Sequence, residues 1–328
     1  MRRHWRKIRY QFEWLGLLGL TSVLPLLPRR TVVGLSQMLA RIVFYFDRHG
    51  QALTLANLAA AFGEEYTLLQ RQEIAHASYC NFSRTVFDLL WSPALTPQNF
   101  HRYIKVENIE VLQRLKACGE SAVVVCIHQG NFEWASLAVG FHGLNVTIVT
   151  GRFKNPRVEG FFRRCREVSG HRIIPQKASI LRLLKHVRHG GLAGMLADLN
   201  RRPTEAATVI EAFGMKMCVT YLHAVLVQRG PAKLVPVEGI SLPDGSCRVI
   251  FHEPLQLPAD ASLQQITQTC WDFFEPGIRA QPENWMWNYR HWRYKPKNAA
   301  REYPFYAQEN IEFDRLASLE NSSCHARR

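Results

Sequence analysis

The sequence lacks the patterns that identify metal-binding and disulfide-stabilised proteins. Its eight cysteines include no C-x-x-C pair, and no group of Cys and His residues has the spacing of a zinc site. Several cysteines lie inside apolar runs, as Cys126 does within 121–127, so we expect reduced, buried thiols in a protein that faces the cytosol. A G-x-S-x-G motif is also absent. We therefore expect neither a metal site nor a nucleophilic serine of that kind.

The sequence also lacks an apolar run long enough to span a bilayer. The best candidate, residues 14–27, is shorter than the roughly 20 residues of a spanning helix, and Pro25 weakens a straight helix there. The basic start before this run resembles a signal peptide, but Pro28-Arg29-Arg30 stands where a cleavage site would need small residues. We predict an uncleaved anchor over residues 1–30 that lies in, or dips into, the inner face of a membrane, with its arginines at anionic headgroups. The alternative is a buried helix at the start of the domain.

Acidic residues are few relative to basic ones, since 41 Lys and Arg stand against 27 Asp and Glu and give a formal charge of +14. This balance predicts an anionic partner: a nucleic acid, an anionic bilayer, an acidic protein or a phosphate. Residues 285–296 interleave aromatic and basic side chains, which can stack nucleotide bases or lie at a lipid headgroup boundary. Because no nucleic-acid-binding motif is visible and an apolar anchor is present, we predict the headgroup boundary and no nucleic acid partner.

The spacing of apolar residues divides the chain into two parts. Helical periodicity over 32–46, 51–62 and 66–91 predicts an all-helical region up to residue 95. After about residue 100, short β-branched runs alternate with helical stretches, which predicts an α/β fold with a mostly parallel sheet flanked by helices. We expect strands at 121–127, 146–150, 172–174, 191–197, 233–237 and 247–252. We expect helices at 131–139, 156–168, 178–188, 219–228 and 262–280.

A histidine comes directly after the most apolar of these strands. In open α/β sheets the chemistry lies beyond the carboxyl ends of the strands, and 121–127 delivers His128 to that edge. Gly130 permits a sharp turn, Asn131 can cap the next helix, and Glu133 falls in its first turn. A neutral imidazole can take a proton from a hydroxyl near pH 7, and a nearby carboxylate can orient it. The alternative is a strand-end His with a Glu that the helix dipole favours.

Two other strands also end in polar residues. Arg152 follows 146–150, and Asp198 follows 191–197. Arginine suits the bidentate binding of phosphate, so we expect His128, Arg152 and Asp198 to converge on one cleft. A capping or loop role for Asp198, paired with Arg201 or Arg202, is an equal alternative. For 163–166 we favour a solvated basic face. Thr220 is expected at the start of the helix 219–228, with Gly214 in a turn before it.

The motifs together resemble the bacterial lipid A biosynthesis acyltransferases, within the lysophospholipid acyltransferase-like group. The most specific likeness is a strand that ends in His-x-Gly-Asn-aromatic-Glu, here residues 128–133. Gly151-Arg152 with Asn155-Pro156 is similar to the family's arginine-bearing stretch, and Asp198 stands in place of its Pro-Asp-Gln stretch without the flanking Pro and Gln. Residues 212–214 with Thr220, and the block 287–296, complete the likeness.

The resemblance implies O-acyl transfer from an acyl thioester, on acyl carrier protein or coenzyme A, to a hydroxyl of a membrane glycolipid such as a lipid A precursor. It implies that His128 is the general base, that Glu133 supports it, and that Asn131, Arg152 and Asp198 bind substrate. No metal and no cofactor besides the acyl-thioester co-substrate are implied. The enzyme is expected on the cytoplasmic face of the bacterial inner membrane, where inner-membrane lipids and an acidic acyl carrier protein are its partners.

The expected organisation is an anchor over 1–30, a catalytic domain over 31–300 whose part 31–95 is helical, and a polar tail over 301–328 that is frayed from about residue 309. Two other functions stay open at this point. An acyltransferase of the same group can act on a different acceptor lipid, and a membrane lipid-binding or carrier-binding protein can use the fold without chemistry.

Overall fold

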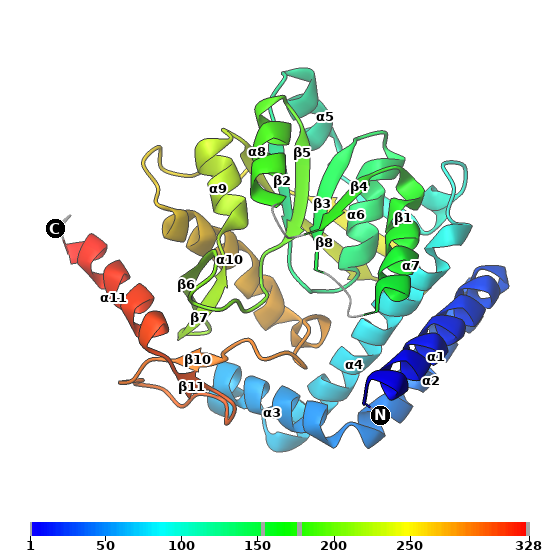
Figure 1. Ribbon diagram of the computed structural model, residues 1–328, viewed down its shortest axis with the longest axis horizontal. Helices are drawn as coiled ribbons and strands as arrows, with labels where there is room; N and C mark the ends of the chain where they lie inside the picture. The colour runs from blue at the N-terminus through cyan, green and yellow to red at the C-terminus, as the bar shows by residue number, and fades with distance from the viewer. Residues whose placement is uncertain (1, 152–154, 176–178, 326–328) are drawn as a thin grey trace.

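A seven-stranded sheet forms the centre of the computed structural model, which describes residues 2–151, 155–175 and 179–325 (Figure 1). The strand order is β1-β9-β8-β2-β5-β3-β4, and only the β8–β9 pair is antiparallel. The predicted mostly parallel α/β sheet is therefore confirmed. Its strands are β1 (Ile104–Glu107), β2 (Ala122–Cys126), β3 (Val146–Thr150), β4 (Arg172–Pro175), β5 (Leu192–Leu196), β8 (Lys233–Ser241) and β9 (Cys247–Phe251).

The central strand β2 shows why the sheet needs cover on both faces. All five of its residues are buried, and successive side chains point to opposite faces. Val123 and Val125 belong to one core cluster, which includes α8, α9 and α10. Val124 and Cys126 belong to the other, which includes α4, α5, α6 and α7. A continuous apolar run is what a strand in such a position requires.

Helices fill both faces of the sheet and one end of the molecule (Figure 1). Those near the sheet are α4 (Leu68–Trp91), α5 (Glu110–Ala117), α6 (Phe132–Phe141), α7 (Pro156–Arg166), α8 (Ser179–Arg188), α9 (Leu222–Arg229) and α10 (Leu263–Ala280). The N-terminal helices are α1 (Arg2–Val23), α2 (Arg29–Phe46) and α3 (Arg48–Phe62). Most predicted helices are found within a few residues of their expected ends, since apolar periodicity and caps such as Thr67 on α4 mark them.

The N-terminal segment is helical but interrupted. Helix α1 ends at Val23, and a short 3-10 turn carries Pro25 before α2 begins at Arg29, as the proline predicts. Leu24 and Val32 are buried, whereas many apolar side chains of α1 and α2 are exposed. Among the helices that the structure describes, none has both the length and the apolar character needed to cross a membrane.

A hairpin that the sequence patterns did not predict lies between β5 and α9. Strands β6 (Ala207–Ala212) and β7 (Met215–Thr220) pair antiparallel through a turn at Phe213-Gly214, where both residues have positive φ. The predicted turn at Gly214 is confirmed. Thr220, however, ends β7 instead of opening a helix, because 215–220 pairs with β6 along its whole length. The strand β1 and the helix α5 were also not predicted.

The C-terminal segment is not frayed where the structure describes it. It forms a small parallel pair, β10 (Tyr294–Lys295) with β11 (Gln308–Glu309), and then the helix α11 (Ile311–His325). Phe313 is fully buried and packs with Val209 and Cys218 of the hairpin. Ala317 is buried in the same cluster and Leu316 packs against it, so a few apolar residues in a mostly polar segment dock this helix.

The tryptophans of 285–292 lie in the core and not at a surface, so the predicted headgroup boundary is wrong for them. Trp285, Trp287 and Trp292 are fully buried around the ring of Phe213. Trp287 donates from its indole nitrogen to the carbonyl of Pro282. Because the rings find partners inside the protein, they need no interface with lipid.

Candidate functional site

His128 lies two residues beyond β2, in a turn that only glycine can complete. The turn is residues 128–131, called here the His128 turn. Gly130 has φ +53°, and a Cβ on it would lie 1.9 Å from the carbonyl oxygen of Gly239. The amide of Gly130 donates to Asn284, and the carbonyl of His128 accepts from Met286. Backbone contacts from distant segments therefore fix the position at which the imidazole leaves the sheet.

Asp198 is the carboxylate that contacts the imidazole. Its Oδ1 lies 2.7 Å from Nδ1 of His128, and its Oδ2 accepts from the backbone nitrogen of His128 at 2.9 Å. Asp198 comes after β5, the parallel neighbour of β2, so the two strand ends bring the side chains together. The predicted convergence of His128 and Asp198 is seen, and it replaces the alternative of a loop carboxylate paired only with Arg201 or Arg202.

The carboxylate of Asp198 is charged despite its complete burial. Burial by itself raises the pKa of this group, but the interactions with His128, by charge and by hydrogen bonds, lower that pKa to about 2. Trp285 adds a third hydrogen bond, from its indole nitrogen to Oδ2 at 2.9 Å. A charged acceptor at Nδ1 keeps the proton of a neutral imidazole on that nitrogen. The basic lone pair is then on Nε2, which makes no hydrogen bond within the described part of the chain.

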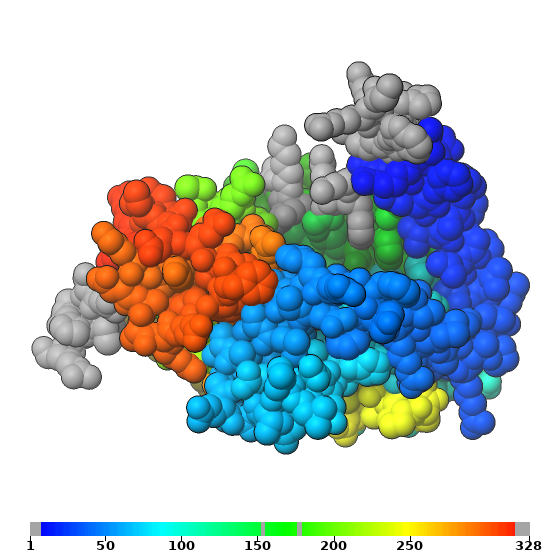
Figure 2. Space-filling model, turned by 90° about the horizontal axis from the view of Figure 1, so that it is seen from below, coloured from blue at the N-terminus to red at the C-terminus, as the bar shows by residue number. Residues whose placement is uncertain are grey.

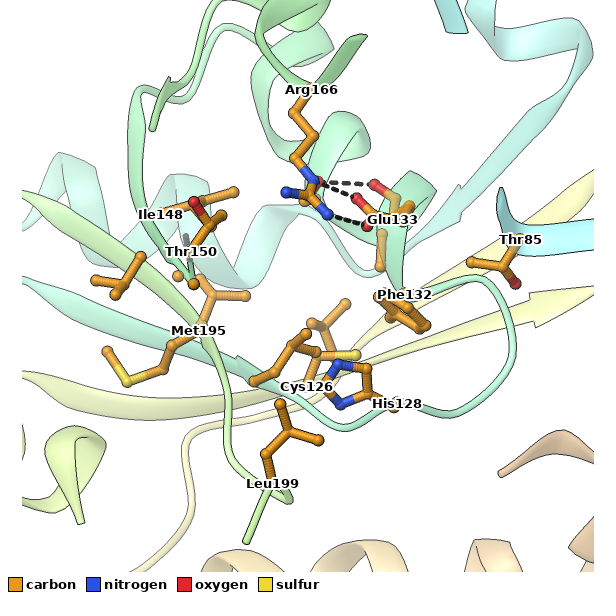
Figure 3. Close-up of a pocket in the computed structure, with 18 of the residues that line it drawn as sticks. Thr85, Cys126, His128, Phe132, Glu133, Ile148, Thr150, Arg166, Met195 and Leu199 are labelled. Carbon is orange, nitrogen blue, oxygen red and sulfur yellow. Dashed lines mark hydrogen bonds and ion pairs between the residues drawn. The ribbon is translucent and has the colours of Figure 1, made fainter. Parts of the chain in front are cut away.

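Glu133 contacts Arg166 in a bidentate pair (Figure 3). The two bonds are 2.8 Å from Nε to Oε2 and 2.5 Å from Nη2 to Oε1. The contact on the imidazole that the sequence suggested for Glu133 is thus made by Asp198 instead. The interpretation of Arg166 as part of a solvated basic face was wrong, since its side chain is only 18% exposed. Burial lowers the pKa of Arg166, but Glu133 outweighs this effect and raises it.

A cavity of about 540 Å³ opens beside these groups. His128, Glu133 and Arg166 line it together with apolar side chains from the sheet and from α4, α6 and α7. Figure 3 shows Phe132 and Leu199 beside the imidazole and Ile148 and Met195 farther across the cavity. Its remaining walls are mostly aliphatic, with Val124, Val139, Val146, Gly194 and Leu89 among them. The site therefore combines a few polar side chains with a mostly apolar cavity.

The other predicted site residues have different positions. Asn131 is fully buried; its oxygen caps α6 at the amide of Trp134 and its nitrogen donates to Asp88 at 2.6 Å. The expected cap is confirmed, but the expected contact of Asn131 with substrate stays a prediction, and both of its polar groups are already bonded. Arg152 lies outside the described residues. Thr220 lines the cavity from the end of β7.

Three residues of the site were not predicted from the sequence. Arg166 shares a helical face with Phe162, four residues earlier, and both line the cavity; that spacing was the available signal. No sequence pattern indicated Trp285 or Asp88. Trp285 contacts Asp198, 87 residues away in the sequence, and Asp88 contacts Asn131, 43 residues away. Among the described residues, no group of three or more His, Cys, Asp and Glu is arranged to hold a metal ion.

Comparison with known proteins identifies a family for the chain. A family model described as bacterial lipid A biosynthesis acyltransferase matches residues 1–294. No curated protein matches the chain. The family consists of acyltransferases, so the chain is an enzyme that transfers acyl groups.

Proposed function

Because the chain belongs to the bacterial lipid A biosynthesis acyltransferase family, we propose that it moves a fatty acyl chain from an acyl thioester to a hydroxyl of a membrane glycolipid, a lipid A precursor. Acyl carrier protein or acyl-coenzyme A is the proposed donor. The observation that carries the proposal is the pair His128–Asp198, with a 2.7 Å contact at Nδ1, at the wall of a mostly apolar cavity.

The chemistry begins with proton transfer from the acceptor. Nε2 of His128 takes the proton of the lipid hydroxyl as its oxygen bonds to the thioester carbonyl carbon, and the carbonyl oxygen becomes an oxyanion. The charge of Asp198 stabilises the imidazolium that forms. The carbon–sulfur bond then breaks, the carbonyl is restored, and the leaving thiolate takes the proton from the imidazolium. The products are the acylated lipid and the free thiol, and His128 is again neutral.

Glu133 and Arg166 have an indirect part in this proposal. Glu133 holds Arg166 through two hydrogen bonds in the cavity wall, and Figure 3 draws this pair above Phe132 and His128. The guanidinium of Arg166 lines the cavity and can stabilise the negative charge that develops on the thioester carbonyl oxygen. Arg152 is proposed to bind the acceptor, as the family resemblance implies.

The cavity is proposed to hold the acyl chain. Its lining residues include Val124 in the middle of β2 and Val139 near the C-terminal end of α6, whereas His128 lies beyond the end of β2. An acyl chain placed along this line would exchange water for aliphatic contact, at about 0.8 kcal/mol for each CH₂ buried. The thioester carbon would then remain beside the imidazole.

Inner-membrane lipids are the proposed partners, on the cytoplasmic face. Helices α1 and α2 expose a group of large apolar side chains that we call the apolar face: Phe12, Leu15, Leu18, Leu20, Val23, Met38, Leu39, Ile42, Val43, Tyr45 and Phe46. Figure 2 shows these N-terminal helices as blue atoms at one end of the molecule. Arg30 and Arg41 on α2 are exposed beside it and suit anionic headgroups. An amphiphilic acceptor would reach the cavity from that surface.

Mass spectrometry of membrane lipids tests the proposed reaction. Host cells would carry the intact protein, the His128→Ala variant, or the His101→Ala variant, in which an exposed histidine outside the site is replaced. We expect one lipid class to gain the mass of a single acyl chain with the intact protein and with His101→Ala, and not with His128→Ala. Identical lipid profiles for all three at equal expression would contradict the proposal and favour lipid or carrier binding without chemistry.

A further inference from the structure

We propose that Asp88, held by Arg29, is a positioning residue for the His128 turn. The structural part of this inference rests on the contacts described below, and its expected effect on catalysis rests on the proposed function. The turn has few bonds of its own, because a segment that reverses direction cannot use the ladder of the sheet. Its position is set by groups outside it. Two of these groups come from α4.

Helix α4 contacts the His128 turn at two places. Oδ2 of Asp88 accepts a hydrogen bond from Nδ2 of Asn131 at 2.6 Å, and the hydroxyl of Thr85 donates to the carbonyl of Gly130 at 2.9 Å. The backbone carbonyl of Asp88 accepts in addition from the indole nitrogen of Trp134. The first turn of α6 and the turn before it are thereby attached to α4. A shift of Asp88 would move the residues on either side of Asn131.

The charge of Asp88 depends on two arginines. Its carboxylate is fully buried and pairs with Arg29 through Oδ1, while Arg84 lies 3.7 Å from Oδ2. Arg29 is the first residue of α2. Its guanidinium lies over the rings of Trp134 at 4.7 Å and Trp91 at 5.2 Å, and its Nε donates to the carbonyl of Gly245 at 2.8 Å.

This arrangement connects the N-terminal helices to the catalytic histidine. The order of contacts is Arg29, Asp88, Asn131 and then the turn that carries His128. A buried carboxylate that loses a cation is costly, so Arg29, together with Arg84, keeps Asp88 in its place. The segment that bears the apolar face is therefore also a part of the site, and not only an attachment to the membrane.

Two substitutions separate the positioning role from general stability. Asp88→Asn removes the charge, and Asn131→Ser keeps a good helix cap while it removes the bond to Asp88 and leaves both arginine pairs intact. Glu73→Gln, an exposed carboxylate on the same helix, is the matched control. The full-length proteins would be compared by amide hydrogen exchange over 128–134, and by kcat and KM with lauroyl-coenzyme A and a bacterial membrane lipid extract.

We expect amide exchange at 131–134 to be about tenfold faster in both variants, with α10 and the sheet unchanged. We expect kcat to fall by about tenfold or more while KM for the thioester stays within about twofold, because the base is displaced and the cavity is intact. Unchanged exchange in Asn131→Ser, or an effect in Glu73→Gln of equal size, would overturn the inference. If the wild type itself transfers no acyl group, the proposed function fails, and the exchange measurement still decides the role of Asp88.

Discussion

At the scale of single residues, the site depends on which carboxylate meets which base. Asp198 meets His128 through two hydrogen bonds, and Glu133 meets Arg166 through two more. The sequence placed His128 correctly at a strand end, because a glycine and a helix cap come after it. It could not assign the carboxylates, since Glu133 is near in sequence and Asp198 is 70 residues away. Neighbouring parallel strands, not sequence distance, determine that pairing.

The lowered pKa of Asp198 gives a prediction about stability at low pH. Its pKa is about 2 in the folded protein, against about 3.9 in an unfolded chain. The group therefore stabilises the fold by roughly 2–3 kcal/mol above pH 4, and this stabilisation is lost as the pH falls through about 2. Denaturant unfolding at pH 6, 4 and 3 should show that the stability gap between wild type and Asp198→Asn narrows as the pH falls. A gap that stays constant would show that the charge of Asp198 is not involved.

For the Glu133–Arg166 pair, we predict that replacing one partner destabilises the protein more than replacing both. Replacing Glu133 by Gln leaves a partly buried guanidinium without its charged partner and should reduce the free energy of unfolding by roughly 1–3 kcal/mol. The double variant Glu133→Gln/Arg166→Met should recover a large part of that loss. Thermal unfolding measures both effects. If the double variant is as unstable as the sum of the single variants, the two side chains do not interact.

The same variants test whether the pair takes part in catalysis. We expect the stable double variant to remain at least about tenfold slower in acyl transfer, because the guanidinium is missing from the cavity wall. Wild-type activity in a folded double variant would limit the pair to a structural role.

At the scale of elements, periodicity predicted the segments that local sequence controls. The helices α2, α3 and α4 and the strand β2 have strong patterns and were found. The hairpin β6–β7 was missed because its turn residues include Phe213, a side chain rarely found at positive φ. The burial of Trp285, Trp287 and Trp292 could not be predicted either, because the aromatic partners come from distant elements.

Helix α11 provides a test at this scale. Phe313 is fully buried against the hairpin, while Ile311, two residues earlier, is 85% exposed. Phe313→Ala should weaken the docking of α11 on the hairpin by about 3–5 kcal/mol, and Ile311→Ala should leave it almost unchanged. Faster hydrogen exchange in β6 and β7 of Phe313→Ala alone would confirm the docking. Equal exchange in both variants would show that α11 does not cover the hairpin.

At the scale of the whole molecule, the fold class was predictable and the strand order was not. Alternating strands and helices indicate a parallel sheet, but local sequence contains nothing that places β9 between β1 and β8. The placement of the helices over the two faces likewise depends on long-range packing. On the face of the molecule seen in Figure 2, the N-terminal helices lie at one end and the C-terminal segment lies at the other. The apolar face belongs to the N-terminal end.

The apolar face predicts where the molecule meets lipid. Phe46→Asp places a charge on this face, and Leu181→Asp places the same charge on α8, at an apolar side chain that is equally exposed, 74% against 76%. Sedimentation with vesicles of anionic phospholipid should show a loss of binding of about tenfold or more for Phe46→Asp and little change for Leu181→Asp. Raised salt should weaken the binding of the wild type, since the net charge is +14. Equal binding by both variants would exclude this face.

The most direct test of the proposed chemistry is acyl transfer by the purified full-length protein. A radiolabelled lauroyl thioester and a bacterial membrane lipid extract would be incubated with wild type, His128→Ala, Asp198→Asn and the control His101→Ala. We predict labelled lipid with wild type and His101→Ala, none with His128→Ala, and a rate lower by roughly 10³–10⁴-fold with Asp198→Asn, because the imidazole would lose its charged partner and its correct tautomer. Transfer at the wild-type rate by His128→Ala would contradict the central claim that His128 is the general base.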